Sequence, residues 1–510
     1  MLIYMSYKAV LIFPTQLFED LQPILGKSKR IYYLIEEPLF FSDKERVENF
    51  NGLKLIMHRA SMKIYEDYLK SKGLDVQYID YHDQDRFHTG IISSTEVIYY
   101  DVVDHLLQSR LDNLFKDYNK KATMLPTQSF ICDLHELDEF IAGRSKNKRK
   151  YFQTDFYRWQ RKRLNILIDD DGDFEGGKLS FDQQNRESAP NEGFPKIKYH
   201  TTQKNKYIEE AQKYVSETFP DHYGNVDNFS HISFSTADAR AKLKVFLENR
   251  LFNFGNYEDS IDTQNPFIYH SILSAALNIG IITPMEVVDE AVDYYYSHPE
   301  TIGINDIEGF VRQIVGWREY YRMVYIHLYD DMVGSNLLEH NREITDIWYS
   351  GNTGILPVDD NIHIAFEYGY LHHIIRLMVV GQFMLLSEIH PKDMYKWFME
   401  FAIDSYDWVM VPNVYGMVGY NDGGKTTTKP YISTANYIFK MSNYKRVKGD
   451  KKSWDYIWRC MYYRFIHKNM EALNNNPRTR RMVWQMNNMK PTELKVLLDD
   501  AEEYLSKLSK

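Results

Sequence analysis

Short apolar runs alternate with amphipathic stretches over the first 140 residues of the chain. The runs are rich in β-branched and aromatic side chains, which is typical of buried strands. Four of them are predicted to be strands: 9–13, 30–36, 76–81 and 96–102. Residues 57–73 instead carry apolar side chains at helical spacing, and Gly73 is suited to end that helix. This alternation predicts a doubly wound parallel sheet, without a GxGxxG dinucleotide fingerprint.

Helical periodicity dominates the rest of the chain from about residue 206. Helices are predicted at 206–218, 236–250, 266–279, 284–297, 305–329, 363–386, 391–406 and 492–508. We therefore predict an α/β domain at 1–140, a connector at 141–205 and a larger all-helical domain at 206–510.

The connector begins with a basic segment at 144–163, which holds nine Lys or Arg residues and one acid and is interleaved with aromatic residues. Such a segment suits a bent or unstacked DNA strand, but an amphipathic helix with a solvated charged face explains it equally well. The DNA-binding candidates are Lys148, Arg149, Arg158 and Arg161. A Gly-, Asp- and Asn-rich loop follows at 169–193.

The composition argues against a disulfide-rich secreted protein, a membrane protein and a protein that coats nucleic acid. The 510 residues carry a formal net charge of −10, which argues against indiscriminate coating of nucleic acid but allows a local basic face. Two cysteines cannot form a disulfide framework, so we expect a reducing, cytoplasmic location. We see no signal peptide, and the most apolar helix is interrupted by Arg376 and Gln382. We expect a monomer with no membrane contact.

Two motifs of the helical part have both a chemical and a structural interpretation. In the stretch 249–284, Ser271 and Ser274 would suit a phosphate at a helix start, with Tyr257 on the other side, although tight helix packing explains the same spacing. Glu308 and Arg312 are four residues apart on one predicted helix, where an ordinary ion pair is the simpler interpretation.

Adjacent histidines stand out in the sequence LHHIIRLMVVGQF. If both lie on one helix, His372 and His373 point about 100° apart and cannot chelate one metal ion. A helical histidine is usually a packed or surface residue. A buried histidine beside a reacting base could instead supply a proton, because its pKa lies near neutrality.

Together these stretches resemble the flavin-binding half of the photolyase/cryptochrome family. The strongest matches are 257–322, which contains EGFVRQIVGWREY, and 363–441, which contains KWFMEFAIDSYDWVMVPNVYGM and KPYISTANY. The nearest likeness is to the bacterial branch that repairs (6-4) photoproducts in DNA. The resemblance spans nearly the whole chain and implies an α/β antenna-type domain followed by a helical FAD-binding domain.

The resemblance also implies roles for particular residues. FAD would be held by Tyr257, Ser271, Leu273, Ser274, Arg312, Asp404 and Asn413. The lesion pocket would be formed by His372, His373, Leu377, Met417, Tyr431 and Glu308, with His372 as the proton donor. Electrons would reach oxidised flavin through Trp397 and Trp348. Trp317 and Trp408 are expected to serve packing, although the family position that matches Trp317 lies beside the flavin and the DNA pocket.

The sequence departs from the family pattern at several places. Met410 stands where the (6-4) relatives carry a glutamate, and lysines at 445 and 448 stand where iron–sulfur ligands are expected. With only two cysteines, a cluster held by four cysteinates is excluded. A ribityllumazine antenna would contact Gln16 and Glu37, and Asp182 would contribute to a Mg²⁺ site.

The function implied by the resemblance is light-driven repair of (6-4) photoproducts in UV-damaged DNA. Three alternatives stay open: a cryptochrome-like photoreceptor without repair, a cyclobutane-dimer photolyase, and a nucleic-acid-binding protein that has lost its flavin.

Overall fold

The first layer of the molecule is a five-stranded parallel sheet with the strand order β3-β2-β1-β4-β5. The computed structural model describes residues 7–144, 151–447, 449–450 and 452–508. The strands are β1 (Lys8–Ile12), β2 (Arg30–Ile35), β3 (Val76–Ile79), β4 (Glu96–Tyr100) and β5 (Ala122–Leu125). Lys8 of β1 lies beside Arg30 on one side and Glu96 on the other. The doubly wound sheet predicted from the alternating pattern is confirmed, and β5, a half-exposed edge strand, was not predicted.

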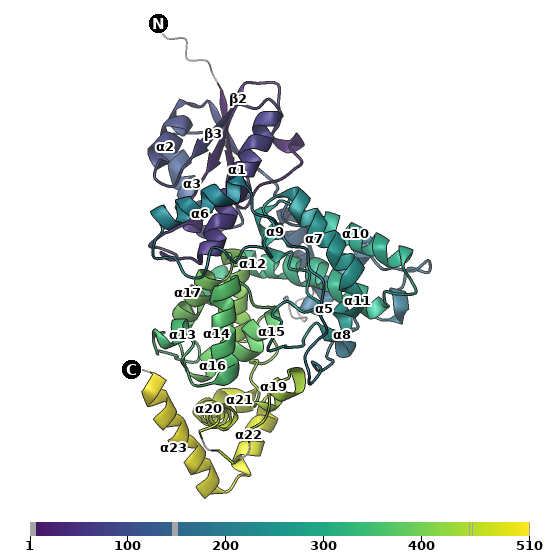
Figure 1. Cartoon of the computed structure of the whole chain (residues 1–510), viewed down its shortest axis with the longest axis vertical. Coiled ribbons are helices and arrows are strands. Elements are labelled where there is room, and N and C mark those ends of the chain that lie inside the picture. Colours follow the sequence, from purple (N-terminus) through teal and green to yellow (C-terminus); the bar gives the residue numbers. More distant parts are fainter. Residues whose placement is uncertain (1–6, 145–150, 448, 451, 509–510) are drawn as a thin grey trace.

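Helices cover both faces of this sheet. Those between the strands and just after them are α1 (Gly52–Ser71), α2 (Gln84–Ser93), α3 (His105–Asp117) and α4 (Leu134–Ala142), with short turns η1 (Gln22–Ile24) and η2 (Pro38–Phe40). Asn51 and Asp104 cap α1 and α3 by accepting hydrogen bonds from backbone N–H groups of the first turn. The first ten residues of α1 are all buried, because α6 (Lys206–Thr218) packs along it (Figure 1).

The connector contains one regular helix. α5 (Gln153–Leu164) includes most of the predicted basic segment, and the irregular chain that follows has only the short turns η3 (Glu175–Gly177) and η4 (Asp182–Gln184). Lys148 and Arg149, two of the DNA-binding candidates, lie outside the described residues.

Many helices build the remainder of the molecule. One group consists of α7 (Thr236–Asn249), η5 (Leu251–Asn253), α8 (Phe254–Tyr257), α9 (Ser274–Ile279), α10 (Pro284–Ser297), α11 (Ile304–Val311), η6 (Arg312–Arg318) and α12 (Glu319–Val333). In Figure 1, α7, α8, α10 and α11 form a lobe at the side, and α12 lies at the centre of the molecule. A second group follows: α13 (Ile347–Ser350), α14 (Leu356–Tyr368), α15 (His373–Ile375), η7 (Arg376–Gly381), α16 (Gln382–Leu386), α17 (Pro391–Phe401), α18 (Asp407–Met410) and η8 (Val411–Val418).

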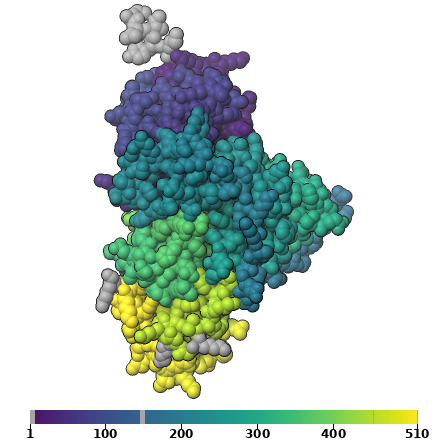
Figure 2. All heavy atoms as spheres, viewed as in Figure 1, coloured from purple at the N-terminus to yellow at the C-terminus, as the bar shows by residue number. Residues whose placement is uncertain are grey.

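The last helices form the end of the molecule opposite the sheet, as both whole-molecule views show (Figures 1 and 2). They are α19 (Asn436–Met441), α20 (Trp454–Lys468), α21 (Met470–Asn475), α22 (Arg480–Asn487) and α23 (Pro491–Leu508). No helix in the described part of the chain is long and apolar enough to cross a membrane.

Three predicted helices differ from the structure. Only the end of 266–279 is helical, as α9, and α17 stops at Phe401 rather than at 406. The predicted helix 363–386 is interrupted, because Gly369 adopts φ of +59° and a Cβ there would lie 2.6 Å from the Ile403 side chain. His372 is therefore extended backbone before α15, with φ −71° and ψ 161°. The assumption that His372 and His373 share a helix was wrong.

Three segments, η6, η7 and η8, are π-helical. Each continues an α-helix, from α11, α15 and α18 respectively. A π turn widens the helix by one residue and is frequent at functional sites. The three π segments lie on the walls of the same cavity.

The sheet and the helical part are joined by buried polar contacts. Asn51 donates to the carbonyl of Phe366 at 3.0 Å, and the Lys54 ammonium donates to the carbonyl of Ser405. The guanidinium of Arg322 donates to Asp101 at 2.8 Å.

Candidate functional site

A cavity of about 230 Å³ lies within the helical part of the molecule. Its walls are drawn from the segments 270–278, 313–318, 370–377 and 408–418, with Asp404 between them. Most of the wall is apolar, and a few charged and polar groups converge on it, which is the composition expected of a small-molecule site.

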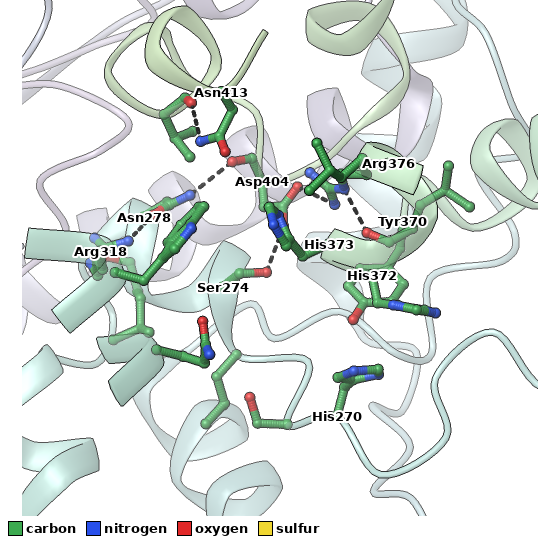
Figure 3. A pocket seen from close by; sticks show the side chains of 18 of the residues that line it. His270, Ser274, Asn278, Arg318, Tyr370, His372, His373, Arg376, Asp404 and Asn413 are labelled. Atoms are coloured by element: carbon green, nitrogen blue, oxygen red, sulfur yellow. Dashed lines mark hydrogen bonds and ion pairs between the residues drawn. The ribbon is translucent and has the colours of Figure 1, made fainter. Parts of the chain in front are cut away.

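The Asp404 carboxylate is the centre of the polar wall (Figure 3). One oxygen accepts from the Ser274 hydroxyl at 2.7 Å, and the other pairs with the Arg376 guanidinium at 2.9 Å. Arg376 also donates to the carbonyl of Leu371 at 2.6 Å. The segment that interrupts the predicted helix is thereby tied to the carboxylate, and the charge pair is held at the edge of the cavity.

A second row of contacts supports Asp404 from behind. Asn278 donates to the backbone carbonyl of Asp404 at 2.8 Å, and Arg318 donates to the side-chain oxygen of Asn278. Arg318 packs between the rings of Phe130 and Trp408, 4.6 and 4.7 Å from their centroids. Burial lowers the pKa of Arg318 to about 10, so it remains a cation at neutral pH.

Several buried polar atoms on cavity-lining side chains have no partner among the described residues. They are both ring nitrogens of His372, Oδ1 of Asn413, Nε1 of Trp317 and Nε of Arg318. Asn413 uses its amide nitrogen to donate to the carbonyl of Val409 at 2.6 Å, which leaves its oxygen as a free acceptor. Unpaired buried polar atoms are rare in folded proteins, so these atoms indicate groups that a ligand would satisfy.

Three histidines stand close together on one side of the cavity. His270 and His372 stack with ring centroids 4.6 Å apart, and His373 packs edge-on to Trp317 at 5.5 Å. Burial lowers the pKa of His270 and of His373 to about 4 and that of His372 well below its usual value, with nearby Arg376 adding to the effect on His372 and His373. All three are neutral at pH 7 in the protein alone.

The structure brings together most of the residues predicted for the flavin and the lesion pocket. The cavity is lined by Ser271, Leu273, Ser274, His372, His373, Leu377, Asp404, Asn413 and Met417. Met410, the departure from the family pattern, also lies on the wall, where its side chain is buried. Tyr257, Arg312, Glu308 and Tyr431 are not among the lining residues.

Glu308 and Arg312 lie behind the wall. Glu308 is fully buried and accepts from the Tyr157 hydroxyl at 2.9 Å and from the backbone N–H of Phe181 at 2.8 Å. Arg312 is 3.3 Å from Glu308 and 3.1 Å from Glu258. These contacts fasten the connector to α11, so Glu308 is a positioning residue in this structure rather than a group that faces the cavity.

Two of the four tryptophans singled out from the sequence face the cavity. Trp397 donates its indole N–H to the carbonyl of Trp348 at 2.9 Å, and both are buried. Phe398, which lines the cavity, is 5.2 Å from Trp397. Trp317, whose family position lies beside the flavin, and Trp408, expected to serve packing, both line the cavity.

The predicted antenna contacts are already used within the protein. The Gln16 amide accepts from the backbone N–H of Phe13 at 3.2 Å and donates to the carbonyl of Tyr100 at 3.2 Å. Glu37 is buried beside Arg110, at 3.4 Å, and burial raises the pKa of Glu37 to about 7. The cavity beside Gln16 measures only about 20 Å³. The structure therefore gives no support for these two antenna contacts.

Arg161 and Asp182 also differ from their predicted roles. Arg161 is fully buried and its guanidinium donates to the carbonyls of Ile166, Leu167 and Leu179, so it cannot reach a phosphate in this conformation; Arg158 is exposed. The Asp182 carboxylate is 2.5 Å from Arg186 and 3.8 Å from Arg312, and these cations oppose a divalent ion there. Among the described residues, no group of three or more His, Cys, Asp or Glu side chains is placed to hold a metal ion.

Sequence reasoning missed three polar residues of the site. Asn278, Arg318 and Arg376 all contact Asp404 directly or through one another. The only available signal was an arginine inside the apolar run 371–383, which in a buried helix requires a carboxylate partner.

Comparisons with known proteins agree with this architecture. A family model described as deoxyribodipyrimidine photo-lyase-related protein matches residues 10–231. A (6-4) photolyase of Agrobacterium fabrum is 30% identical over 436 residues, which cover 82% of this chain and 84% of that protein. The chain belongs to the photolyase/cryptochrome family. The resemblance predicted from the flavin-half motifs is thus confirmed at the level of the family.

Two solved structures share the fold of this photolyase-family chain. A bacterial class III photolyase from Agrobacterium tumefaciens superposes with a TM-score of 0.55 at 18% identity, covering 96% of this chain and 92% of that one. A cryptochrome from Synechocystis sp. PCC6803 superposes with a TM-score of 0.56 at 14% identity, covering 98% and 99%. At these identities the two structures bear on the fold alone.

Proposed function

We propose that this chain is a light-dependent DNA photolyase that binds FAD in the cavity around Asp404. The proposal rests on the unpaired polar atoms of His372, Asn413 and Trp317 on side chains that line an otherwise apolar cavity. Family membership supports it, since the relative that matches most of the chain is named a (6-4) photolyase.

The cavity residues fit a flat, largely apolar ring system with a polar edge. Asn413 offers an unpaired acceptor to a ring N–H, and the Asp404–Arg376 pair offers both signs of charge to the ring's polar edge. Ser271, which lines the cavity, would approach a phosphate of the cofactor, whereas the Ser274 hydroxyl already donates to Asp404. When bound and reduced, FAD supplies the electron that light excitation transfers to the substrate.

For the substrate we propose (6-4) photoproducts in UV-damaged DNA. His372, His373, Leu377 and Met417 would surround the lesion after it flips out of the duplex. His372 would donate the proton. Because burial holds its pKa well below the usual value, the imidazole has to gain a proton in the complex, and the phosphates of bound DNA are the anions that favour the charged form.

The test is repair of an oligonucleotide with one defined (6-4) lesion by the purified, reduced protein, in light and in darkness. We expect light-dependent repair, and a loss of about 100-fold or more in His372→Asn with flavin still bound, because general acids typically contribute at least that much. His298→Asn, at an exposed histidine on the far end of α10, is the matched control and should repair normally.

The other outcomes identify the alternatives. Repair of cyclobutane dimers but not of (6-4) photoproducts would show that the protein is a cyclobutane-dimer photolyase. Bound and photoreducible flavin without repair of either lesion would indicate a photoreceptor. A purified protein without flavin absorption would contradict the proposal at its first step.

A further inference from the structure

We propose that the exposed face of α22, together with Arg478 just before it, binds the DNA duplex beside the lesion. In this arrangement the arginines contact phosphates and Trp484 packs against a base or sugar. The inference rests on the proposed function, because it assigns a further part of the surface to the same DNA partner.

The charge of this segment is unlike that of the chain as a whole. Residues 474–490 contain three arginines and one lysine and no acidic residue, whereas the whole chain has a formal net charge of −10. Arg478, Arg480 and Arg481 are exposed, and none of the described carboxylates lies within 4.0 Å of their guanidinium groups. Arg480 does donate from Nε to the carbonyl of Asn474 at 3.1 Å. Surface guanidinium groups without a carboxylate partner are suited to phosphate, which they bind in a bidentate manner.

Trp484 lies on the same face of α22. Its side chain is 63% exposed, the most exposed of the large apolar side chains described. Arg480 and Arg481 precede it by four and three residues and so lie one turn away on the same side of the helix. Val483 and Met486 are buried on the opposite side and attach α22 to the protein. Exposed aromatic side chains beside cationic groups are the combination that proteins use to bind unstacked nucleic acid.

The exposed face of α22 is connected to the predicted lesion pocket, so one DNA molecule could contact both. Asn476, between α21 and α22, donates to the Tyr420 hydroxyl at 3.3 Å and to the carbonyl of Thr428 at 3.0 Å. The loop that holds these two residues leads to Tyr431, a residue of the predicted lesion pocket. Burial raises the pKa of Tyr431, and Arg478 is close enough to oppose that rise. In Figure 1, α22 lies with α19 and α21 beyond the cavity helices.

The experiment measures binding of the full-length protein to undamaged and lesion-containing duplexes in the dark, by fluorescence anisotropy between 50 and 200 mM salt. One variant combines Arg478→Gln, Arg480→Gln and Arg481→Gln, and a second carries Trp484→Ala. The matched control combines Lys27→Gln, Lys72→Gln and Lys204→Gln, three exposed lysines elsewhere on the surface that change the net charge equally.

We expect the arginine variant to bind both duplexes at least tenfold more weakly. Three lost phosphate contacts should also reduce the slope of log K against log salt by about 2.7, since each contact contributes about 0.9. Trp484→Ala should weaken binding about fivefold or more without changing the slope, because stacking on one base contributes about 1–3 kcal/mol. The lysine control should bind as the unaltered protein does.

Unchanged affinity and slope in both variants would overturn the inference. A concentration-dependent dimer that Trp484→Ala abolishes would also overturn it, by assigning the face to a second copy of the chain. Because DNA binding in darkness needs no repair, the two proposals can fail separately: absence of repair with a reduced salt slope would refute the photolyase proposal and keep the DNA surface.

Discussion

The carboxylate of Asp404 connects three segments that are far apart in the chain. Ser274 and Arg376 bind its two oxygens, and Asn278 binds its backbone carbonyl. The Asp404 and Arg376 side chains are only 10% and 13% exposed, so neither charge is well solvated without the other. Removing one member of a buried pair is more damaging than the pair itself is stabilising.

Asp404→Asn tests this dependence. The amide keeps the shape of the side chain but leaves the Arg376 guanidinium without a counter-charge, so we expect the free energy of unfolding to fall by about 3–5 kcal/mol. Flavin content per protein should fall as well. Urea denaturation and the visible absorption of the purified protein measure the two effects. Glu503→Gln, which removes an exposed ion pair with Lys507, should change stability by less than about 1 kcal/mol.

Glu400 is a second buried carboxyl, on α17, with a clear dependence on pH. It accepts from the Tyr349 hydroxyl at 2.6 Å and lies 3.7 Å from the Lys396 ammonium, but its side chain is only 2% exposed. Burial outweighs these contacts and raises the pKa of Glu400 from 4.5 to about 7. A raised carboxyl pKa favours the folded state below pH 4.5, and the advantage is lost as pH rises to 7.

Glu400→Gln should therefore flatten the pH dependence of stability. Glutamine still accepts from Tyr349 and has no proton to release. From pH 4.5 to 7 the unaltered protein should lose about 3 kcal/mol relative to the variant, because one pKa unit corresponds to about 1.4 kcal/mol. Urea denaturation at intervals from pH 4.5 to pH 8 measures the difference. Parallel curves for the two proteins would contradict the assignment.

At the scale of elements, the π segments η6, η7 and η8 give the cavity its walls. Gly381 shows how closely η7 is packed, because a Cβ there would lie 2.4 Å from the carbonyl of Arg376 and 3.1 Å from both methyl groups of Val418 in η8. The wide turn directs that carbonyl toward Gly381, so only a residue without a side chain fits.

Gly381→Ala is expected to destabilise the protein by about 1–3 kcal/mol, the usual penalty for overpacking a close-packed interior. Because η7 and η8 both line the cavity, flavin affinity should decrease with it, as measured by fluorescence on titration with FAD. Gly143→Ala is the control, since φ is −69° and the nearest atom lies 3.3 Å away. An equal effect of both substitutions would show that the close contact between η7 and η8 does not cause the loss of stability.

Elements with strong local signals could be predicted from the sequence. α6 and α10 begin and end where predicted, because Asn205 caps the first and Thr283 with Pro284 starts the second. The break at Gly369 and the π turns could not be predicted, since they depend on contacts with residues such as Ile403 and Val418 that are distant in the sequence.

The same limit applies to the site. The apolar pattern placed Asp404 and Asn413 in the helical part, and the likeness to the family placed them at a flavin. Neither could show that Trp408 lines the cavity, because hydrophobicity does not distinguish a side chain that faces a cavity from one that faces the core. Arg161 shows the opposite error, since a basic run conceals which of its members turn inward.

At the scale of the whole molecule, a buried charge cluster joins the sheet domain to the helical part. Arg46 pairs with Asp104 and lies 3.5 Å from Asp407, which also accepts from the hydroxyls of Tyr325 and Tyr395. The Arg46, Asp104 and Asp407 side chains are each less than 5% exposed.

Arg46→Met should leave two buried carboxylates close together without a cation. We expect the free energy of unfolding to fall by about 3–5 kcal/mol at neutral pH. The loss should shrink as pH is lowered, because burial raises the pKa of Asp407 and its protonation relieves the repulsion. Calorimetry at pH 7 and pH 5 measures both effects. A loss independent of pH would show that the packing of the Arg46 side chain, rather than its charge, joins the two parts.

The cavity draws its walls from residues 254–418, and no shorter stretch of the chain contains all of them. The ribosome adds about 5–20 residues per second, so roughly ten to thirty seconds pass between synthesis of the first and the last wall residue. Throughout that interval the sheet domain can fold, but Ser274 has no Asp404 to bind and the cofactor has no complete site. For the proposed flavin, loading is then one of the last steps in the biogenesis of the protein, and a nascent chain stalled before η8 should emerge without colour.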